Sequence, residues 1–91
     1  MYEIVLSNQF KKDMRAAKRR GYDMSLLNNV VETLAAGQAL DAKYRDHSLS
    51  GTYSGFRECH ITPDWLLIYR IHEQQLLLFL SRTGTHSDLF K

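Results

Sequence analysis

The sequence predicts an α+β fold in which a small antiparallel sheet of about four strands packs on an N-terminal helical hairpin, in the order β-α-α-β-β-β. Three features predict it: a short apolar strand at the start, two stretches with the spacing of amphipathic helices, and three strand-like apolar stretches in the second half. Short connections favour one layer of helices on one sheet. The 91 residues fit a single domain, residues 1–91.

The N-terminal half supplies the first strand and the helical hairpin. YEIVLS has strand composition, and Ser7 at its end is placed to cap a helix that runs to about Arg20 and ends at Gly21. Its apolar side carries Phe10, Met14 and Ala17. A second helix, capped by Asp23 or by Ser25, ends at Gly37. Its apolar stripe consists of Leu26, Leu27, Val30, Val31 and Leu34.

The C-terminal half supplies the remaining strands. A polar loop over residues 38–55, with a brief strand near His47, is followed by FRECHI, WLLIYRIH and QLLLFLSR, which the turns TPDW and Glu73-Gln74 join. The last two strands are apolar on both faces. We therefore expect them at the centre of the sheet, with helices on one face and the other face partly open.

Composition excludes several classes of protein. No apolar run is long enough to span a bilayer, and the N-terminus has no signal-peptide pattern, so we expect a cytoplasmic protein that does not bind membranes. A single cysteine, Cys59, excludes an internal disulfide and is expected to be a small buried residue. The net charge is only +2, but basic residues concentrate in KKDMRAAKRR at residues 11–20, where an acidic partner is expected.

Side chains suited to catalysis gather in the C-terminal half. They are His47, Arg57, His60, Asp64, Trp65, Arg82, His86 and Phe90. One imidazole can accept a proton while another donates one, a guanidinium can stabilise a phosphate, and aromatic rings can stack on unpaired bases. Such a set can cleave RNA through attack by its own 2′-hydroxyl without a metal. The histidines lack the paired spacing of common metal sites, so we expect no metal and no cofactor.

At these residues the chain resembles a known family. DHSLSGTYSGFRECHITPDWLLIYRI followed by LSRTGTHSDLF is similar to the YafQ branch of the RelE/ParE superfamily of bacterial toxins. The resemblance implies a ribosome-dependent endoribonuclease that cleaves mRNA in the decoding site and so inhibits translation. It implies that the acid/base group consists of His47, His60, Asp64 and His86 and that Arg82 stabilises the phosphate. Trp65, Phe90 and Arg57 are assigned to substrate binding.

The resemblance also implies partners. These are an antitoxin encoded by the adjacent gene, the ribosome with its mRNA, and operator DNA bound only through the toxin–antitoxin complex. We assign contact with ribosomal RNA to Lys11, Lys12, Arg15, Lys18 and Arg19. Our hypothesis for catalysis is that His86 is the acid, with His60 or Asp64 acting as or supporting the base.

Two other functions remain open at this point. One is a ParE-like toxin that inhibits DNA gyrase and is not a nuclease, and the other is a non-catalytic module that binds RNA or antitoxin. The histidine- and arginine-containing set favours the nuclease, because the gyrase-inhibiting branch generally lacks it. Primer extension on a translated message would separate the three functions.

Overall fold

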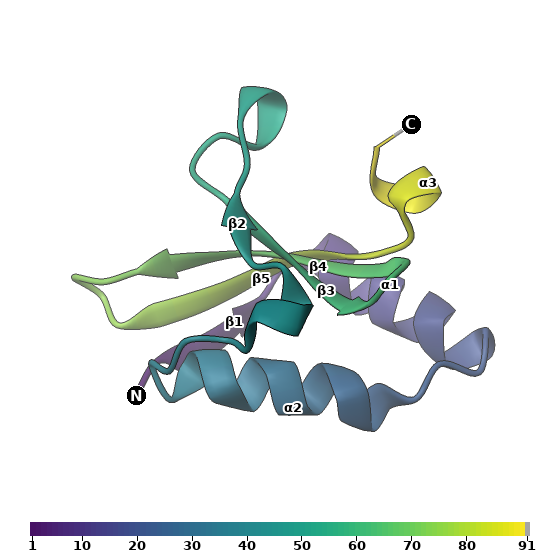
Figure 1. The fold of residues 1–91 in the computed structure, drawn as a ribbon, viewed down its shortest axis with the longest axis horizontal. Coiled ribbons are helices and arrows are strands. Elements are labelled where there is room, and N and C mark those ends of the chain that lie inside the picture. The colour runs from purple at the N-terminus through teal and green to yellow at the C-terminus, as the bar shows by residue number, and fades with distance from the viewer. Residues whose placement is uncertain (91) are drawn as a thin grey trace.

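The computed structural model describes residues 1–90 and contains a five-stranded sheet with the order β1-β5-β4-β3-β2. The strands are β1 (Glu3–Leu6), β2 (His47–Ser48), β3 (Arg57–Thr62), β4 (Trp65–His72) and β5 (Leu77–Gly84). The last three form an antiparallel meander with β4 at its centre (Figure 1). The sheet is mixed, because β1 pairs with β5 in parallel orientation.

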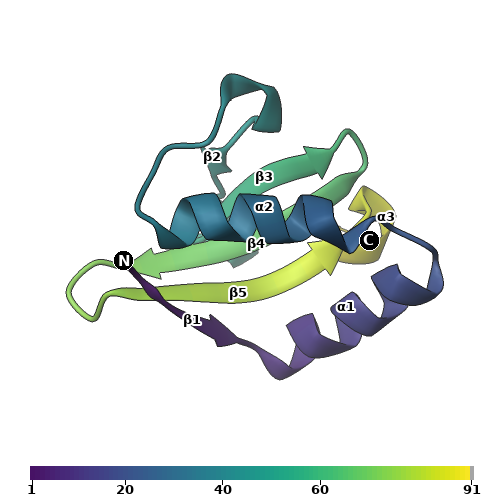
Figure 2. The same cartoon turned by 90° about the horizontal axis from the view of Figure 1, so that it is seen from below.

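Two helices cover one face and one edge of this sheet. Helix α1 (Asn8–Arg19) lies beside β5, and α2 (Met24–Ala35) crosses beneath β3 and β4 (Figure 2). Ser7 caps α1 as predicted, through a hydrogen bond from the Phe10 amide, and Asp23 is the cap of α2. A short helix, α3 (His86–Leu89), follows β5 and lies on the other side of the sheet (Figure 1).

The main core lies between the helices and the sheet. It includes Phe10 of α1, Leu27 and Val30 of α2, and the side chains of β4 that point toward them, such as Leu67 and Tyr69. The prediction of a helix-covered face is confirmed. Cys59 is fully buried in this core, and burial raises the pKa of its thiol to about 12, so it has the structural role that we expected.

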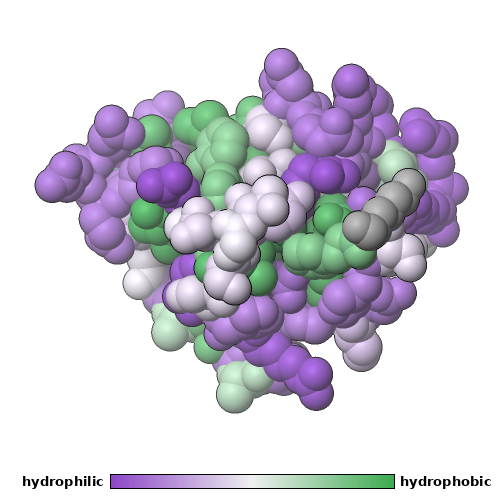
Figure 3. All heavy atoms as spheres, turned by 90° about the horizontal axis from the view of Figure 1, so that it is seen from above, coloured by the Kyte–Doolittle hydropathy of each residue, from purple (hydrophilic) through white to green (hydrophobic). Residues whose placement is uncertain are grey.

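The opposite face, which we call the open face, carries a smaller apolar cluster of its own. Leu66, Ile68 and Leu89 are buried there, with Tyr53 and Phe56 packed against them. This cluster is possible because β4 is apolar on both faces, as the sequence predicts for a central strand. Seen from this side, apolar and polar side chains are interspersed (Figure 3).

The structure differs from the predicted fold in two details. The brief strand near His47 forms and adds a fifth strand, and the sheet is mixed rather than entirely antiparallel. The order β-α-α-β-β-β is otherwise confirmed, with two short 3₁₀ turns (Ala42–Tyr44 and Gly51–Tyr53) inside the long polar loop. Within residues 1–90, the structure contains no helix of the length and apolarity needed to cross a membrane.

Candidate active site

Strand register brings three of the predicted site residues onto the open face. His47 pairs with Glu58 across β2 and β3, and Ile68 of β4 pairs both with Glu58 and with Arg82 of β5. Directly opposed residues point to the same face, and side chains two apart along a strand share a face. His47 of β2, Glu58 and His60 of β3, and Arg82 of β5 therefore lie on one face of the sheet.

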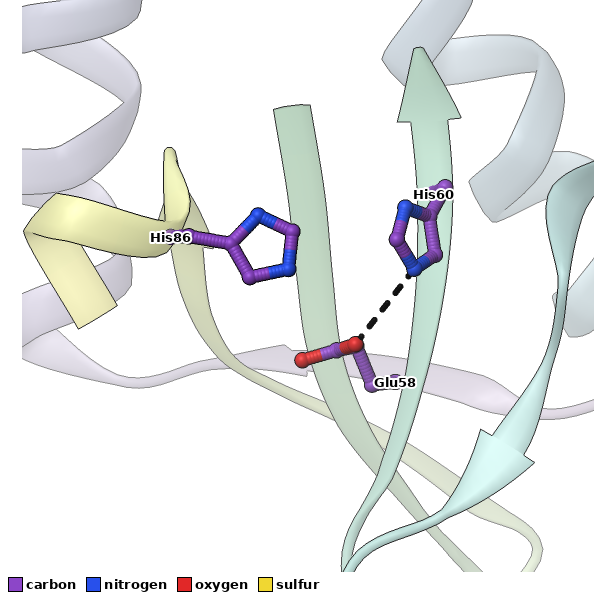
Figure 4. Close-up of side chains that lie close together, drawn as sticks. All are labelled: Glu58, His60 and His86. Atoms are coloured by element: carbon purple, nitrogen blue, oxygen red, sulfur yellow. Dashed lines mark ion pairs between the residues drawn. The ribbon is translucent and has the colours of Figure 1, made fainter. Parts of the chain in front are cut away.

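The imidazoles of His47, His60 and His86 lie in a row. The ring centroid of His60 is 6.3 Å from that of His47 and 5.7 Å from that of His86. Figure 4 shows His86 extending from α3 toward His60 on β3, with the Glu58 side chain below them. The row unites residues 39 positions apart in the chain, so the sheet and not local sequence creates it.

A buried carboxylate supports this row. Glu58 is only 5% exposed, and its Oε1 lies 3.5 Å from His47 Nε2 and 3.6 Å from His60 Nε2. A buried carboxylate needs compensating partners, and protonated imidazoles would provide them. Glu58 can therefore stabilise positive charge on either ring.

Asp64 orients His86. Its Oδ1 lies 3.2 Å from His86 Nδ1 and accepts a hydrogen bond from the His86 backbone amide at 3.3 Å. These contacts, the side-chain one first, lower the pKa of the Asp64 carboxyl below its ordinary value. If Nδ1 carries the proton donated to Asp64, Nε2 of His86 is the ring nitrogen left to face a substrate.

Arg82 is held at the edge of the site by a carboxylate from α1. Its Nε donates to Asp13 Oδ2 at 2.8 Å, and Nη2 donates to Oδ1 at 3.3 Å. This contact is the main cause that raises the pKa of the guanidinium, and Tyr53 contributes as well. Because a guanidinium has five N–H donors, Arg82 retains the capacity to bind a phosphate while Asp13 fixes its position.

Trp65 is a core residue, which corrects its assignment to substrate binding. The side chain is 3% exposed, packs against Tyr22 with ring centroids 4.8 Å apart, and donates from Nε1 to Thr83 Oγ1 at 2.9 Å. The reason is the pleat of β4, which turns its first residue toward the helices. A base cannot stack on a ring that the core encloses.

Arg57 also requires a correction, because it alternates with Glu58 along β3 and lies on the other face of the sheet. It forms an ion pair with Asp46 at 2.9 Å and donates to Ser48 Oγ. The Tyr69 hydroxyl donates to the same Asp46 carboxylate. Arg57 therefore fixes the start of the β2 segment and does not contact a substrate bound at the histidines.

Phe90 and the basic side of α1 keep positions that suit their predicted roles. The Phe90 ring is 43% exposed and lies 6.3 Å from the His86 ring and 5.7 Å from that of Tyr53. It is therefore accessible beside the imidazole row. The five basic residues assigned to RNA contact, Lys11, Lys12, Arg15, Lys18 and Arg19, are all exposed.

The site also has the donors for a metal ion, which sequence spacing did not predict. Ligand atoms of Glu58, His60 and His86 all lie within 4.8 Å of one another. Two imidazole nitrogens and one carboxylate oxygen suit zinc or copper. The donors are distributed over β3 and α3, so no short sequence motif signals them.

Glu58 and Asp13 are the site residues that sequence reasoning missed. Glu58 is two residues before His60, so strand alternation puts both on one face, but no sequence feature indicates that Glu58 is buried between two imidazoles. Asp13 is a single acidic residue within the basic segment KKDMRAAKRR. A lone opposite charge on an otherwise basic helix is the signal that could have found it.

Comparison with known proteins places the chain in a family of bacterial toxins. Residues 2–91 match the model of the family described as bacterial toxin of type II toxin–antitoxin system, YafQ. The chain is 40% identical to the mRNA interferase toxin YafQ of Escherichia coli K12 over 89 residues, covering 97% of this chain and 95% of that protein. Two solved structures are similar over essentially the whole of both chains.

The first is a metal-bound toxin from Helicobacter pylori, with 48% identity, a TM-score of 0.93 and coverage of 99% of this chain and 100% of that one. The second is the Escherichia coli DinJ–YafQ complex, with 39% identity, a TM-score of 0.91 and full coverage of both chains. The fold and the site thus define a bacterial toxin of the RelE/ParE type. The chain belongs to the YafQ family of type II toxin–antitoxin toxins.

Proposed function

We propose that this toxin is an endoribonuclease that cleaves mRNA in the ribosomal decoding site by metal-independent acid/base catalysis. The observation that carries the proposal is the convergence of His60 and His86, 5.7 Å apart between ring centroids, on the face that also presents Arg82. Groups this close can contact a single phosphodiester. The naming of the Escherichia coli relative as an mRNA interferase supports the same activity.

The reaction assigns one role to each group. The base, His60, takes the proton of the ribose 2′-hydroxyl, and the 2′-oxygen attacks phosphorus. The bond from phosphorus to the 5′-oxygen breaks, leaving a 2′,3′-cyclic phosphate and a 5′-hydroxyl. The acid, His86, gives its proton to the departing 5′-oxygen. Each proton transfer typically contributes about 10²–10⁴-fold to the rate.

The contacts of the two carboxylates favour these assignments. Asp64 contacts Nδ1 of His86 and so holds the ring with Nε2 free to donate a proton to the leaving oxygen. Asp64 is thereby engaged with the acid, so the base is His60, with Glu58 beside it to stabilise the charge it acquires. His47, which contacts the same carboxylate, is the alternative base.

The test is cleavage of ribosome-bound and free mRNA by purified toxin, followed by primer extension. We expect discrete cuts on the ribosome-bound message and slow cleavage of free RNA. A substrate with sulfur in place of the 5′-oxygen has a better leaving group, so His86→Ala should slow its cleavage far less than that of the ordinary message. Equal slowing of both would refute the acid role, and gyrase-linked DNA damage without RNA cuts would favour the ParE-like alternative.

We further propose that the basic side of α1 binds ribosomal RNA and that a cognate antitoxin covers the open face. Replacing Lys11, Lys12, Arg15 and Arg19 by Glu should abolish sedimentation with ribosomes at low salt without unfolding the toxin. Antitoxin bound over the apolar cluster and Phe90 would bury the imidazole row. Crystallisation of the DinJ–YafQ complex supports such a partner, through which operator DNA would also be bound.

Metal binding is a second candidate property of the same side chains. The donor geometry at Glu58, His60 and His86, together with the metal-bound relative from Helicobacter pylori, favours it. A bound ion would occupy both the acid and the base, so metal should inhibit cleavage and a chelator should restore it. Calorimetric titration with zinc should show one site in the unmodified toxin and none in Glu58→Gln. Zinc binding of equal strength by both proteins would refute this assignment.

A further inference from the structure

We propose that Arg20 is a positioning residue for the reaction, because its ion pair with Asp88 fixes helix α3 and thereby holds the His86 imidazole in place. The inference rests on the proposed acid role of His86. Arg20 lies at the end of α1, 66 residues from His86, and does not contact the imidazole row itself.

Helix α3 needs external anchors because it has only four residues. An isolated helix of this length is not stable in water, since the cost of nucleation is not repaid. His86 is its first residue, so any tilt of α3 moves the imidazole directly. The geometry of the site therefore depends on what holds this one turn.

The Asp88 carboxylate is the centre of that anchoring. Oδ2 accepts from Arg20 Nη1 at 2.7 Å and from the Thr85 amide at 2.9 Å, while Oδ1 accepts from Arg20 Nη2 at 3.2 Å. The Asp88 amide donates to Thr85 Oγ1 at 3.1 Å, which completes a capping box. One side chain thus joins the cap of α3 to the end of α1.

Gly84 makes this arrangement possible. A Cβ at this position would lie 2.8 Å from Asp88 Oδ2, closer than real Cβ atoms approach other atoms, and 3.0 Å from Asp88 Cβ, a tight contact. The carboxylate therefore packs directly against the bare backbone at the end of β5. The end of the strand, α1 and α3 meet at this point, which lies beside the Asp13–Arg82 pair.

Because the Arg20–Asp88 ion pair is exposed to solvent, its effect on the position of α3 can be measured apart from its effect on the stability of the fold. The side chains of Arg20 and Asp88 are 44% and 30% exposed, and ion pairs this open to solvent contribute little to global stability. Leu89 is buried in the apolar cluster and holds the other end of α3, whereas Asp64, the direct partner of His86, is 70% exposed. A bidentate arginine–carboxylate pair does restrict orientation, which is what a proton donor requires.

The experiment compares Arg20→Gln with the unmodified toxin in single-turnover cleavage of ribosome-bound mRNA at saturating toxin. We expect the rate to fall about 10–100-fold, with ribosome binding and melting temperature nearly unchanged. Arg20→Lys, which keeps the charge but loses the two-pronged geometry, should recover part of the rate. Arg70→Gln is the matched control, because it removes the same charge toward the far end of β4, and should cleave at the unmodified rate.

A double variant tests whether Arg20 acts through His86. In a His86→Ala background, Arg20→Gln should cause no further slowing, and with the 5′-sulfur substrate its effect should shrink as the effect of His86→Ala does. Equal slowing in both backgrounds, or an unchanged rate in the single variant, would overturn the inference.

Backbone ¹⁵N relaxation gives a readout independent of activity. Residues 86–89 should become more mobile in Arg20→Gln. Unchanged order parameters for these residues would refute the claim that Arg20 fixes α3. If His86→Ala instead cleaves at the unmodified rate, the proposed acid role fails, and the positioning role of Arg20 in catalysis fails with it. The two failures are therefore distinguishable.

Discussion

Replacing Asp13 by Ala should destabilise the toxin strongly, although Asp13 lies on the basic surface helix. The side chain is 9% exposed and accepts four hydrogen bonds, two from Arg82, one from the Gln9 side chain and one from the amide of Thr83, which is itself buried. Alanine leaves the Thr83 amide unsatisfied, at about 1–3 kcal/mol, and removes two charge-assisted bonds from a largely buried guanidinium. We expect a total loss of about 3 kcal/mol.

The assay is thermal or urea unfolding followed by circular dichroism. For a domain of this size each kcal/mol lowers the melting temperature by about 4–8 °C, so Asp13→Ala should melt about 12–24 °C lower. Asp13→Asn keeps an acceptor for the Thr83 amide and should lose roughly half as much free energy. Glu32→Ala, on the exposed surface of α2, should change stability by less than about 0.5 kcal/mol.

A loss below about 1 kcal/mol for Asp13→Ala would refute the reasoning, since it would mean that water replaces Asp13 at little cost. The double variant Asp13→Ala, Arg82→Ala isolates the pair. If the two losses add completely, the ion pair is not what holds Arg82, and its position in the site would need another explanation.

Three further predictions concern stability, titration and reactivity. Trp65→Phe loses the hydrogen bond to Thr83 Oγ1 and should lower the unfolding free energy by about 1–2 kcal/mol in urea titrations, while the folded toxin still cleaves at nearly the original rate. A large loss of cleavage rate with little loss of stability would instead mean that Trp65 stacks on a substrate base. The contacts with His86 lower the pKa of Asp64, so its contribution to stability is fully present above the unfolded pKa of about 3.9 and is lost as the pH falls through the lower folded pKa. Carboxyl ¹³C titration of His86→Ala should show the pKa of Asp64 returning toward about 3.9. The Cys59 thiol, with its pKa raised to about 12 by burial, should react with a thiol reagent only as fast as the protein unfolds, and rapid modification of the native toxin would contradict its buried position.

The sequence predicted most of the fold because each main element has a local signal. Ser7 and Asp23 cap helices with periodic apolar residues, and the three C-terminal strands are separated by recognisable turns. The parallel pairing of β1 with β5 has no such signal. This pairing depends on how α1 and α2 pack and where they bring the chain back to the sheet. The four residues of β1 do not themselves specify it.

The site was predicted less completely, for a different reason. Histidines are conspicuous in a sequence, so His47, His60 and His86 were found, and the register of the sheet places them in one row. Whether a neighbour faces the row depends on the phase of each strand. Trp65 and Arg57 point to the opposite face of the sheet from the histidines, and the type of their side chains does not reveal which face they occupy.

The turn HITPDW shows how a short segment can serve three environments. His60 precedes the turn on the open face, Asp64 within the turn reaches His86 on α3, and Trp65 follows it into the core. The buried indole fixes the start of β4, and Asp64 is the residue immediately before it, so core packing limits where the carboxylate can reach. The His86 imidazole is thus oriented from one side by a turn anchored in the core and, through Asp88, from the other side by α1. A small domain with little spare stability can hold a catalytic geometry in this way, because the contacts that orient His86 extend from elements that the core already fixes.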